Sequence, residues 1–147
     1  MPRHSDRQET KELHPGVLKG GGYPALPDAP GPHPGVVVIH EAYGLNQNIK
    51  DIAGRFAAQG YAALAVDLFG GRNRVICMAR FMTGMLGGSV NRFGISELKA
   101  ALTHLSAMPE VDADRVGAIG FGRGGAFAIA WPCNDNRLKA ITPFYRA

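Results

Sequence analysis

The sequence lacks a long apolar run and has few cysteines. No stretch of its 147 residues approaches the ~18 consecutive apolar residues that a membrane span requires. The cysteines, Cys77 and Cys133, are too few and too unpatterned for a disulfide framework or a zinc site. The first sixteen residues mix both charges and contain no apolar segment of a secretory signal. These absences predict a cytoplasmic protein with no bound metal and no membrane partner.

The charge pattern is equally plain. The chain is 46% hydrophobic and 19% charged, as in ordinary globular proteins. Its net charge of +4 includes a loose group of arginines at positions 72, 74 and 80. No aromatic residues interleave with them, as they do on a surface that stacks single-stranded bases. We therefore expect a solvated surface and no nucleic-acid partner.

Apolar runs and helical patterns alternate along the chain. Continuous runs that are typical of strands buried on both faces occur at 36–40, 61–66, 116–120 and 140–144. Helical patterns lie at 46–59, 74–86, 96–108 and 126–133, and a turn is expected at 112–114. A short strand is also possible near Val17 or at 23–26, where Pro24 would confine it to a sheet edge. The order predicts an α/β fold, with a mostly parallel sheet and helices on both faces.

We expect a short polar N-terminus followed by one domain. Residues 1–13 are polar, and we expect them to be disordered or frayed, with a single α/β domain over 14–147. The last expected strand, Ala140 to Phe144, stops three residues before the sequence does. We expect this strand to be an open, apolar edge that is prone to self-association.

The segment from Val116 to Gly125 runs from a buried strand through a glycine-rich turn into a helix. Two mechanisms use such a segment. In the first, the nucleophile elbow G-x-Nu-x-G, Gly120 and Gly124 would flank position 122. The backbone N–H of Arg123 would then donate to an oxyanion at the start of the helix. The residue at the nucleophile position is Gly122, which tolerates the strained backbone but has no side chain to attack with.

The second mechanism is the dinucleotide fingerprint G-x-G-x-x-G, whose spacing Gly120, Gly122 and Gly125 also match. That fingerprint requires an acidic residue about 20 positions later, and the region around Arg146 has none. A single arginine could face the 2′-phosphate of NADP. A non-catalytic anion- or nucleotide-binding module is therefore the alternative function, and a glycine turn without any ligand also remains open.

Taken together, three segments resemble the dienelactone hydrolase family. Residues 35–46 look like a strand-to-helix segment of that family, with its H-E-x-x-G-L pattern beginning at His40. Residues 65–69 resemble the end of its next strand. Residues 111–125 resemble the approach to its nucleophile turn, which normally contains G-F-C-x-G-G. The segments follow one another in order over nearly the whole chain.

The resemblance implies an α/β-hydrolase fold that opens lactone or ester bonds of small carboxylate-bearing substrates without a cofactor. Glu41 matches the glutamate that contacts and helps to ionise the family's thiol; alternatively, it is a loop carboxylate that caps a helix. The backbone N–H groups of Ala42 and Arg123 match the two oxyanion-hole donors. Arg72 lies about one residue from the place of the arginine that holds the substrate carboxylate.

The departures from the family pattern bear on activity. The family's cysteine falls on Gly122, and its acid and histidine follow later strands. After Gly122 the sequence offers Asp135, in an expected surface turn, and no histidine. His40 belongs to the oxyanion loop and is expected to be structural rather than a catalytic base. We therefore expect a partial α/β-hydrolase fold without its C-terminal strands, a truncated chain that is inactive as a hydrolase.

Overall fold

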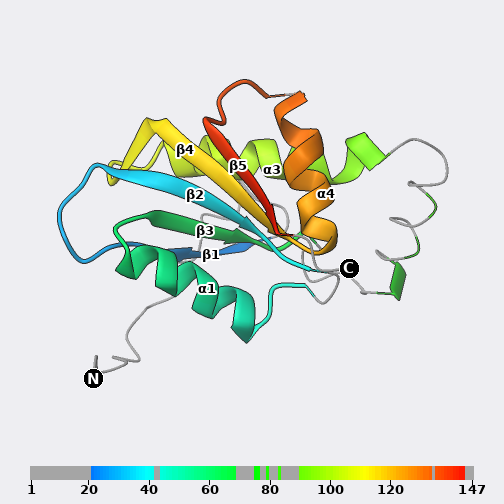
Figure 1. The fold of residues 1–147 in the computed structure, drawn as a ribbon, viewed down its shortest axis with the longest axis horizontal. Helices are drawn as coiled ribbons and strands as arrows, with labels where there is room; N and C mark the ends of the chain where they lie inside the picture. The colour runs from blue at the N-terminus through cyan, green and yellow to red at the C-terminus, as the bar shows by residue number, and fades with distance from the viewer. Residues whose placement is uncertain are drawn as a thin grey trace.

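The computed structural model describes residues 21–41, 44–68, 75–76, 79, 83, 90–133 and 135–144 (Figure 1). The expectations for residues 1–13 and Val17 lie outside the described residues. Most of the expected helix 74–86 also lies outside them, although positions 75, 76, 79 and 83 are helical.

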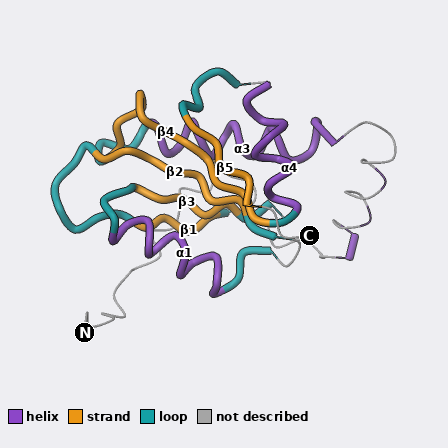
Figure 2. The backbone as a smooth tube through the Cα atoms, viewed as in Figure 1, coloured by secondary structure: helices purple, strands orange, loops and turns teal. Residues whose placement is uncertain are grey.

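One sheet forms the centre of the fold (Figure 2). Among the described residues, its five strands lie in the order β1-β3-β2-β4-β5. The strands β2, β3, β4 and β5 run parallel, and β1 pairs antiparallel with β3. Their bounds are Gly22–Ala25 for β1, His33–Ile39 for β2, Ala62–Val66 for β3, Val111–Phe121 for β4 and Ala140–Phe144 for β5.

The buried strands are those with continuous apolar runs. All of β3 and the last five residues of β2 are buried, because the sheet is covered on both faces at its centre. The strand β1 contains Pro24 and lies at one edge of the sheet, as expected. The strand β5 lies at the other edge of the described sheet, and all five of its residues are exposed.

The strand β4 is longer than expected. Its pairing with β2 begins at Val111, and the register then shifts, so that Pro34 pairs with Asp112 whereas Gly35 pairs with Val116. The prediction that a turn at 112–114 precedes the strand is therefore wrong, because β4 already begins at Val111. Residues 112–114 form an irregularity inside β4, where the extra residues bulge from the ladder.

Three helices in the described part of the chain pack against the sheet. The first, α1 (Gln47–Ala58), begins where the side chain of Asn46 accepts the N–H of Ile49 at 3.1 Å. It ends before Gly60, whose φ of +91° suits glycine. The next, α3 (Val90–Ser106), begins six residues before the expected start at Ser96. The last, α4 (Arg123–Ala130), begins three residues before the expected start and gives way to a 3₁₀ turn at Trp131–Cys133.

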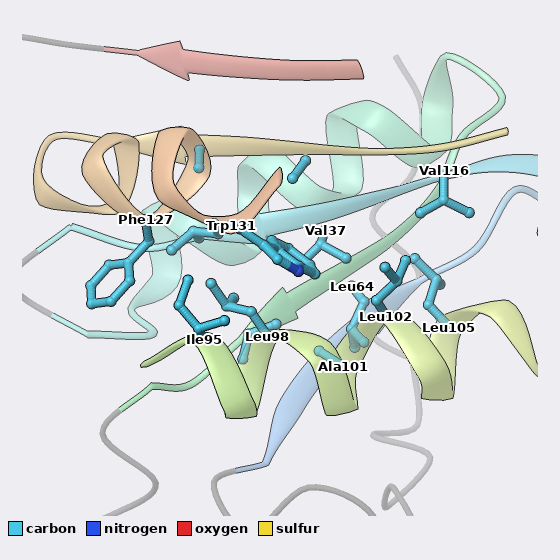
Figure 3. Close-up of a cluster of buried hydrophobic side chains, with 14 of the residues drawn as sticks. Val37, Leu64, Ile95, Leu98, Ala101, Leu102, Leu105, Val116, Phe127 and Trp131 are labelled. Atoms are coloured by element: carbon cyan, nitrogen blue, oxygen red, sulfur yellow. The ribbon is translucent and has the colours of Figure 1, made fainter. Parts of the chain in front are cut away.

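The helices lie on opposite faces of the sheet, which confirms the mostly parallel α/β architecture. One cluster packs α1 against β1, β2 and β3, through residues such as Ile49, Ala53 and Val38. A larger cluster packs α3 and α4 against the other face, with Leu98, Leu102 and Trp131 fully buried (Figure 3). These apolar contacts position the turn between β4 and α4.

Candidate active site

The turn between β4 and α4 has an unusual backbone conformation at Gly122, with φ +54° and ψ −117°. Side chains of L-amino acids rarely adopt this region, so glycine holds it without strain. The N–H of Gly122 donates to the Phe144 carbonyl at 2.9 Å, and its own carbonyl accepts the N–H of Gly125 at 3.0 Å. The turn is thus tied to both β5 and α4.

Two further glycines let the strand and the helix approach each other. A Cβ on Gly120 would overlap the carbonyl oxygen of Gly124. A Cβ on Gly124 would lie 2.7 Å from the carbonyl oxygens of both Ile39 and His40. Neither position has room for a side chain, so the spacing of Gly120 and Gly124 is a packing requirement.

The space for a Cβ at each glycine also distinguishes the nucleophile elbow from the dinucleotide fingerprint. In the dinucleotide fingerprint, the third glycine serves close packing of helix and strand, and here that residue would be Gly125. A Cβ on Gly125 would lie 3.6 Å from the Gly120 carbonyl oxygen, which is an ordinary contact. The tight positions, 120 and 124, are the flanking glycines of a nucleophile elbow. The packing therefore favours the elbow over the fingerprint.

Glu41 faces the turn from the end of β2. A Cβ on Gly122 would lie 3.6 Å from Cγ of Glu41 and 3.9 Å from its Cβ. These two residues come together because β2 and β4 are parallel neighbours, so that their carboxyl ends meet at the same edge of the sheet. The cap of α1 is Asn46, so the alternative role of Glu41 as a helix cap is not observed.

His40 links the ends of β2 and β3. Its side chain is buried, and Nε2 accepts the backbone N–H of Leu68 at 3.0 Å. The Nδ1–H group donates to the Glu41 carbonyl, which also accepts the N–H of Gly44 at 3.2 Å. Because both ring nitrogens are used in this way, the contacts favour a structural role that fixes the backbone of Glu41.

Other expected site residues lie wholly or partly outside what the structure describes. Ala42 and Arg72 lie outside the described residues. Arg123 is the first residue of α4, where backbone N–H groups have no acceptor inside the helix, but its side chain is not described. Within the described ranges, no cluster of three or more His, Cys, Asp or Glu side chains could hold a metal ion. No helix in those ranges is long and apolar enough to cross a membrane.

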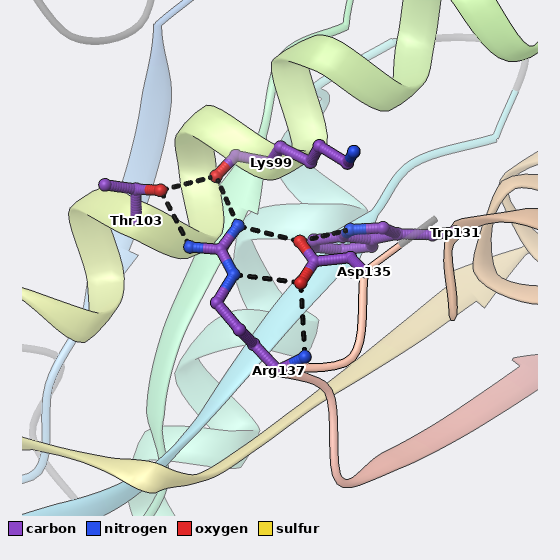
Figure 4. A network of polar contacts seen from close by, with 5 residues as sticks. All are labelled: Lys99, Thr103, Trp131, Asp135 and Arg137. Carbon is purple, nitrogen blue, oxygen red and sulfur yellow. Dashed lines mark hydrogen bonds and ion pairs between the residues drawn. The ribbon is translucent and has the colours of Figure 1, made fainter. Parts of the chain in front are cut away.

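The structure has a turn at Asn136 and Arg137, as expected for this segment, but the expected surface position is wrong for Asp135. Its side chain is 4% exposed and accepts hydrogen bonds from Trp131 Nε1 at 3.2 Å and from Arg137 Nε and Nη2 at 2.9 and 2.7 Å (Figure 4). These bonds, above all those from Arg137, lower the pKa of Asp135 to about 2. Arg137 also donates to Thr103 Oγ1 at 2.9 Å, so the network fastens the loop after α4 to α3. Sequence reasoning missed it because an Asp between two asparagines is typical of a turn.

Comparisons with known proteins agree with the geometry of the turn. The model of the dienelactone hydrolase family matches residues 21–146. A Synechocystis protein named as a carboxymethylenebutenolidase is 30% identical over 88% of this chain and 55% of its own length. Protein usf of Aquifex pyrophilus is 33% identical over 91% of this chain and 59% of its own length.

Solved structures give the same result. A dienelactone hydrolase-like promiscuous phosphotriesterase from metagenomic libraries superposes with a TM-score of 0.71 and 36% identity, over 82% of this chain and 51% of its own. An acetyl xylan esterase from Paenibacillus superposes with a TM-score of 0.67 and 28% identity, over 84% of this chain and 43% of its own. This chain spans about half the length of the curated relatives that it matches.

Proposed function

Because the chain belongs to the dienelactone hydrolase family, we propose that its elbow turn faces small carboxylate-bearing esters or lactones but does not hydrolyse them through a covalent intermediate. The observation that carries this proposal is Gly122 at the apex of the elbow. The backbone has the conformation that lifts a nucleophile toward the substrate, and the residue has no side chain. Glu41 faces this position, but Gly122 offers it no thiol to ionise.

The other groups expected at the site would bind a substrate rather than attack its carbonyl carbon. The N–H of Arg123, at the start of α4, would donate to the carbonyl oxygen of the ester. The family resemblance assigns the second donor to the N–H of Ala42, and Arg72 lies near the position that would hold the substrate carboxylate. In our proposal these groups orient a substrate whose acyl group is never transferred to residue 122.

The expected loss of rate is large. Removing the nucleophile of a triad hydrolase costs about a million-fold in turnover, or roughly 8 kcal/mol of transition-state stabilisation. An oxyanion hole alone can leave about a thousand-fold of catalysis over water. Turnover at an enzymatic rate is therefore not expected from this chain.

Acyl transfer to residue 122 gives a direct test. The chain is prepared with Cys77→Ser and Cys133→Ser, so that no native thiol reacts, and incubated with an activated ester. We expect no acyl adduct by intact mass spectrometry, whereas the added change Gly122→Cys should give one acyl group at residue 122. A Cβ fits at this position, in ordinary contact with Glu41, although φ of +54° strains the backbone of any residue other than glycine.

Gly122→Ala is the matched control, because it fills the same space without a nucleophile. Circular dichroism of each variant establishes that it is folded. Saturable ester hydrolysis by the unmodified chain, with an acyl adduct on any residue of the turn, would contradict the proposal.

We further propose that β5 is a surface for self-association. All five residues of this edge strand are exposed, and none of them is charged. Unpaired strand edges of this kind are templates for another chain.

A further inference from the structure

We infer that Glu41 is a general base for the direct attack of water on an activated ester bound at the elbow. The water molecule takes the place that a nucleophilic side chain of residue 122 would occupy. This inference rests on the function proposed above, in which the site binds esters without acyl transfer to residue 122. It adds a slow hydrolysis that needs no covalent intermediate.

Glu41 lies level with Gly122 across two neighbouring strands. The parallel register pairs Ile39 of β2 with Gly120 of β4, and each site residue follows two positions later along its own chain. Apart from chain neighbours, Cγ and Cβ of Glu41 are the only heavy atoms of described residues within 4 Å of a Cβ at residue 122. The place of a nucleophile is therefore bordered by Glu41 and has room for a small molecule.

The carboxylate of Glu41 is able to take a proton from such a molecule. No residue in the described part of the chain donates a hydrogen bond to this carboxylate or forms an ion pair with it. An ionised carboxylate offers two acceptor oxygens, and a water molecule that donates to one of them becomes a better nucleophile. The side chain is half-buried, so water can reach it.

The backbone of Glu41 is held in place next to the turn. Its carbonyl accepts hydrogen bonds from Nδ1 of His40 and from the N–H of Gly44, the latter at 3.2 Å. The other ring nitrogen of His40 accepts the N–H of Leu68 at 3.0 Å. The buried imidazole is thus occupied with backbone groups, whereas the carboxylate beside it faces the turn. A base that is fixed in this way does not have to be ordered when the substrate binds.

The reaction is a single addition and elimination. The oxygen of water forms a bond to the carbonyl carbon while one of its O–H bonds breaks, and the proton passes to the carboxylate of Glu41. The N–H of Arg123, at the start of α4, would donate to the oxyanion that forms. The oxyanion then collapses, the bond to the ester oxygen breaks and a phenolate leaves with its electron pair. The proton on Glu41 returns to solvent, which restores the base.

The expected rate lies below that of a hydrolase with a covalent nucleophile. A positioned general base contributes about 10²–10⁴-fold, and an oxyanion hole alone leaves about a thousand-fold over water. At the lower end these factors give about 10⁵-fold, whereas enzymes reach about 10⁶-fold or more. Slow turnover of activated esters is therefore expected.

Hydrolysis of para-nitrophenyl acetate tests the role of the carboxylate, because its phenolate leaves without a proton donor. All variants carry Cys77→Ser and Cys133→Ser, and circular dichroism establishes that each is folded. Glu41→Gln, which keeps the size of the side chain, should lower saturable hydrolysis about 100-fold. Glu110→Gln is the matched control and should keep the full rate, because Glu110 precedes β4 at the end of the strand that lies away from the elbow.

Two further variants distinguish a base from a residue that only supports the fold. Gly122→Ala should also lower the rate, because its Cβ takes the place of the attacking water. Added formate should restore part of the rate to Glu41→Ala, where the shortened side chain leaves room for an external carboxylate. It should not restore the rate to Glu41→Gln, whose amide fills that room.

A single turnover in water enriched in a heavy oxygen isotope identifies the attacking atom. We expect the label in the released acetate and not in the protein, as measured by intact mass spectrometry. Label in the carboxyl group of Glu41 would show that this residue attacks the ester itself, and it would overturn the inference.

The remaining outcomes separate the inference from the proposed function. A rate that is equal in Glu41→Gln and the parent chain, or no hydrolysis above buffer, would overturn the role of Glu41 and leave the proposed function in place. An acyl adduct on a residue of the turn would contradict the proposed function itself.

Discussion

Asp135→Asn should make the stability of the fold less dependent on acid. Asp135 lies under the loop after α4 with its side chain 4% exposed, and it accepts two hydrogen bonds from Arg137 and one from Trp131. These bonds stabilise the ionised carboxylate and lower its pKa from 3.8 to about 2. By linkage, a shift of this size contributes about 2 kcal/mol to the free energy of unfolding at neutral pH.

The sign of the pH dependence follows from the direction of this shift. Because the pKa is lower in the folded chain, the contribution is fully present above pH 5, where the carboxyl is ionised in both states. It declines as the pH falls from about 4 toward 2, where the unfolded chain binds the proton first. The unmodified chain should therefore exceed Asp135→Asn by about 2 kcal/mol at pH 7, and most of this difference should be lost by pH 2.

Urea unfolding at a series of pH values measures this difference. Trp131 is the only tryptophan and is fully buried, so its fluorescence reports on unfolding, with circular dichroism as the second signal. Asp112→Asn is the matched control, because Asp112 pairs with Arg115 at 2.8 Å near the surface. That change should have a much smaller effect, since solvent screens an exposed pair. A difference between the unmodified chain and Asp135→Asn that stays constant from pH 7 to pH 2 would refute the electrostatic explanation.

Two further predictions concern the elbow turn. Gly120→Ala and Gly124→Ala should each destabilise the fold by about 1–3 kcal/mol, because each Cβ meets backbone oxygen within 2.7 Å. Gly125→Ala, inside α4 with ordinary space for a Cβ, should be neutral or stabilising by up to about 1 kcal/mol. Equal losses in urea unfolding at all three positions would argue against the elbow. Calorimetric titration with NADP and with inorganic phosphate should give no heat at millimolar ligand, whereas saturable binding that Gly122→Ala abolishes would revive the nucleotide-binding alternative.

The central strands and their order of alternation with helices could be predicted from the sequence. Apolar runs such as 62–66 are buried on both faces, and few other structures require that pattern. The start of α3 could not be predicted in the same way. Gly94 lies inside α3 in the structure, where a Cβ would overlap the ring of Phe127. This glycine serves a contact with α4, and contacts between elements do not show in a local pattern.

The hydrogen-bond network around Asp135 could not be predicted from the sequence for a related reason. Its local sequence predicts a turn, and the backbone N–H of Arg137 does donate to the Asp135 carboxylate as in such turns, at 3.2 Å. The burial of the carboxylate comes from Trp131 and from Arg137 reaching Thr103 on α3, 34 residues earlier in the chain. A long-range partner of this kind is visible only in the fold.

The elbow shows which part of a motif reports architecture and which part reports chemistry. Gly120 and Gly124 are required by carbonyl oxygens of the neighbouring backbone, so these positions stay glycine whether or not the site reacts. The position between them is not constrained in that way, because a Cβ there would meet only the side chain of Glu41, at ordinary contact distance. The flanking glycines therefore report the architecture of the turn, while the nucleophile for covalent hydrolysis would have to come from residue 122. A glycine at that position keeps the turn free of strain and removes the atom that would attack the carbonyl carbon.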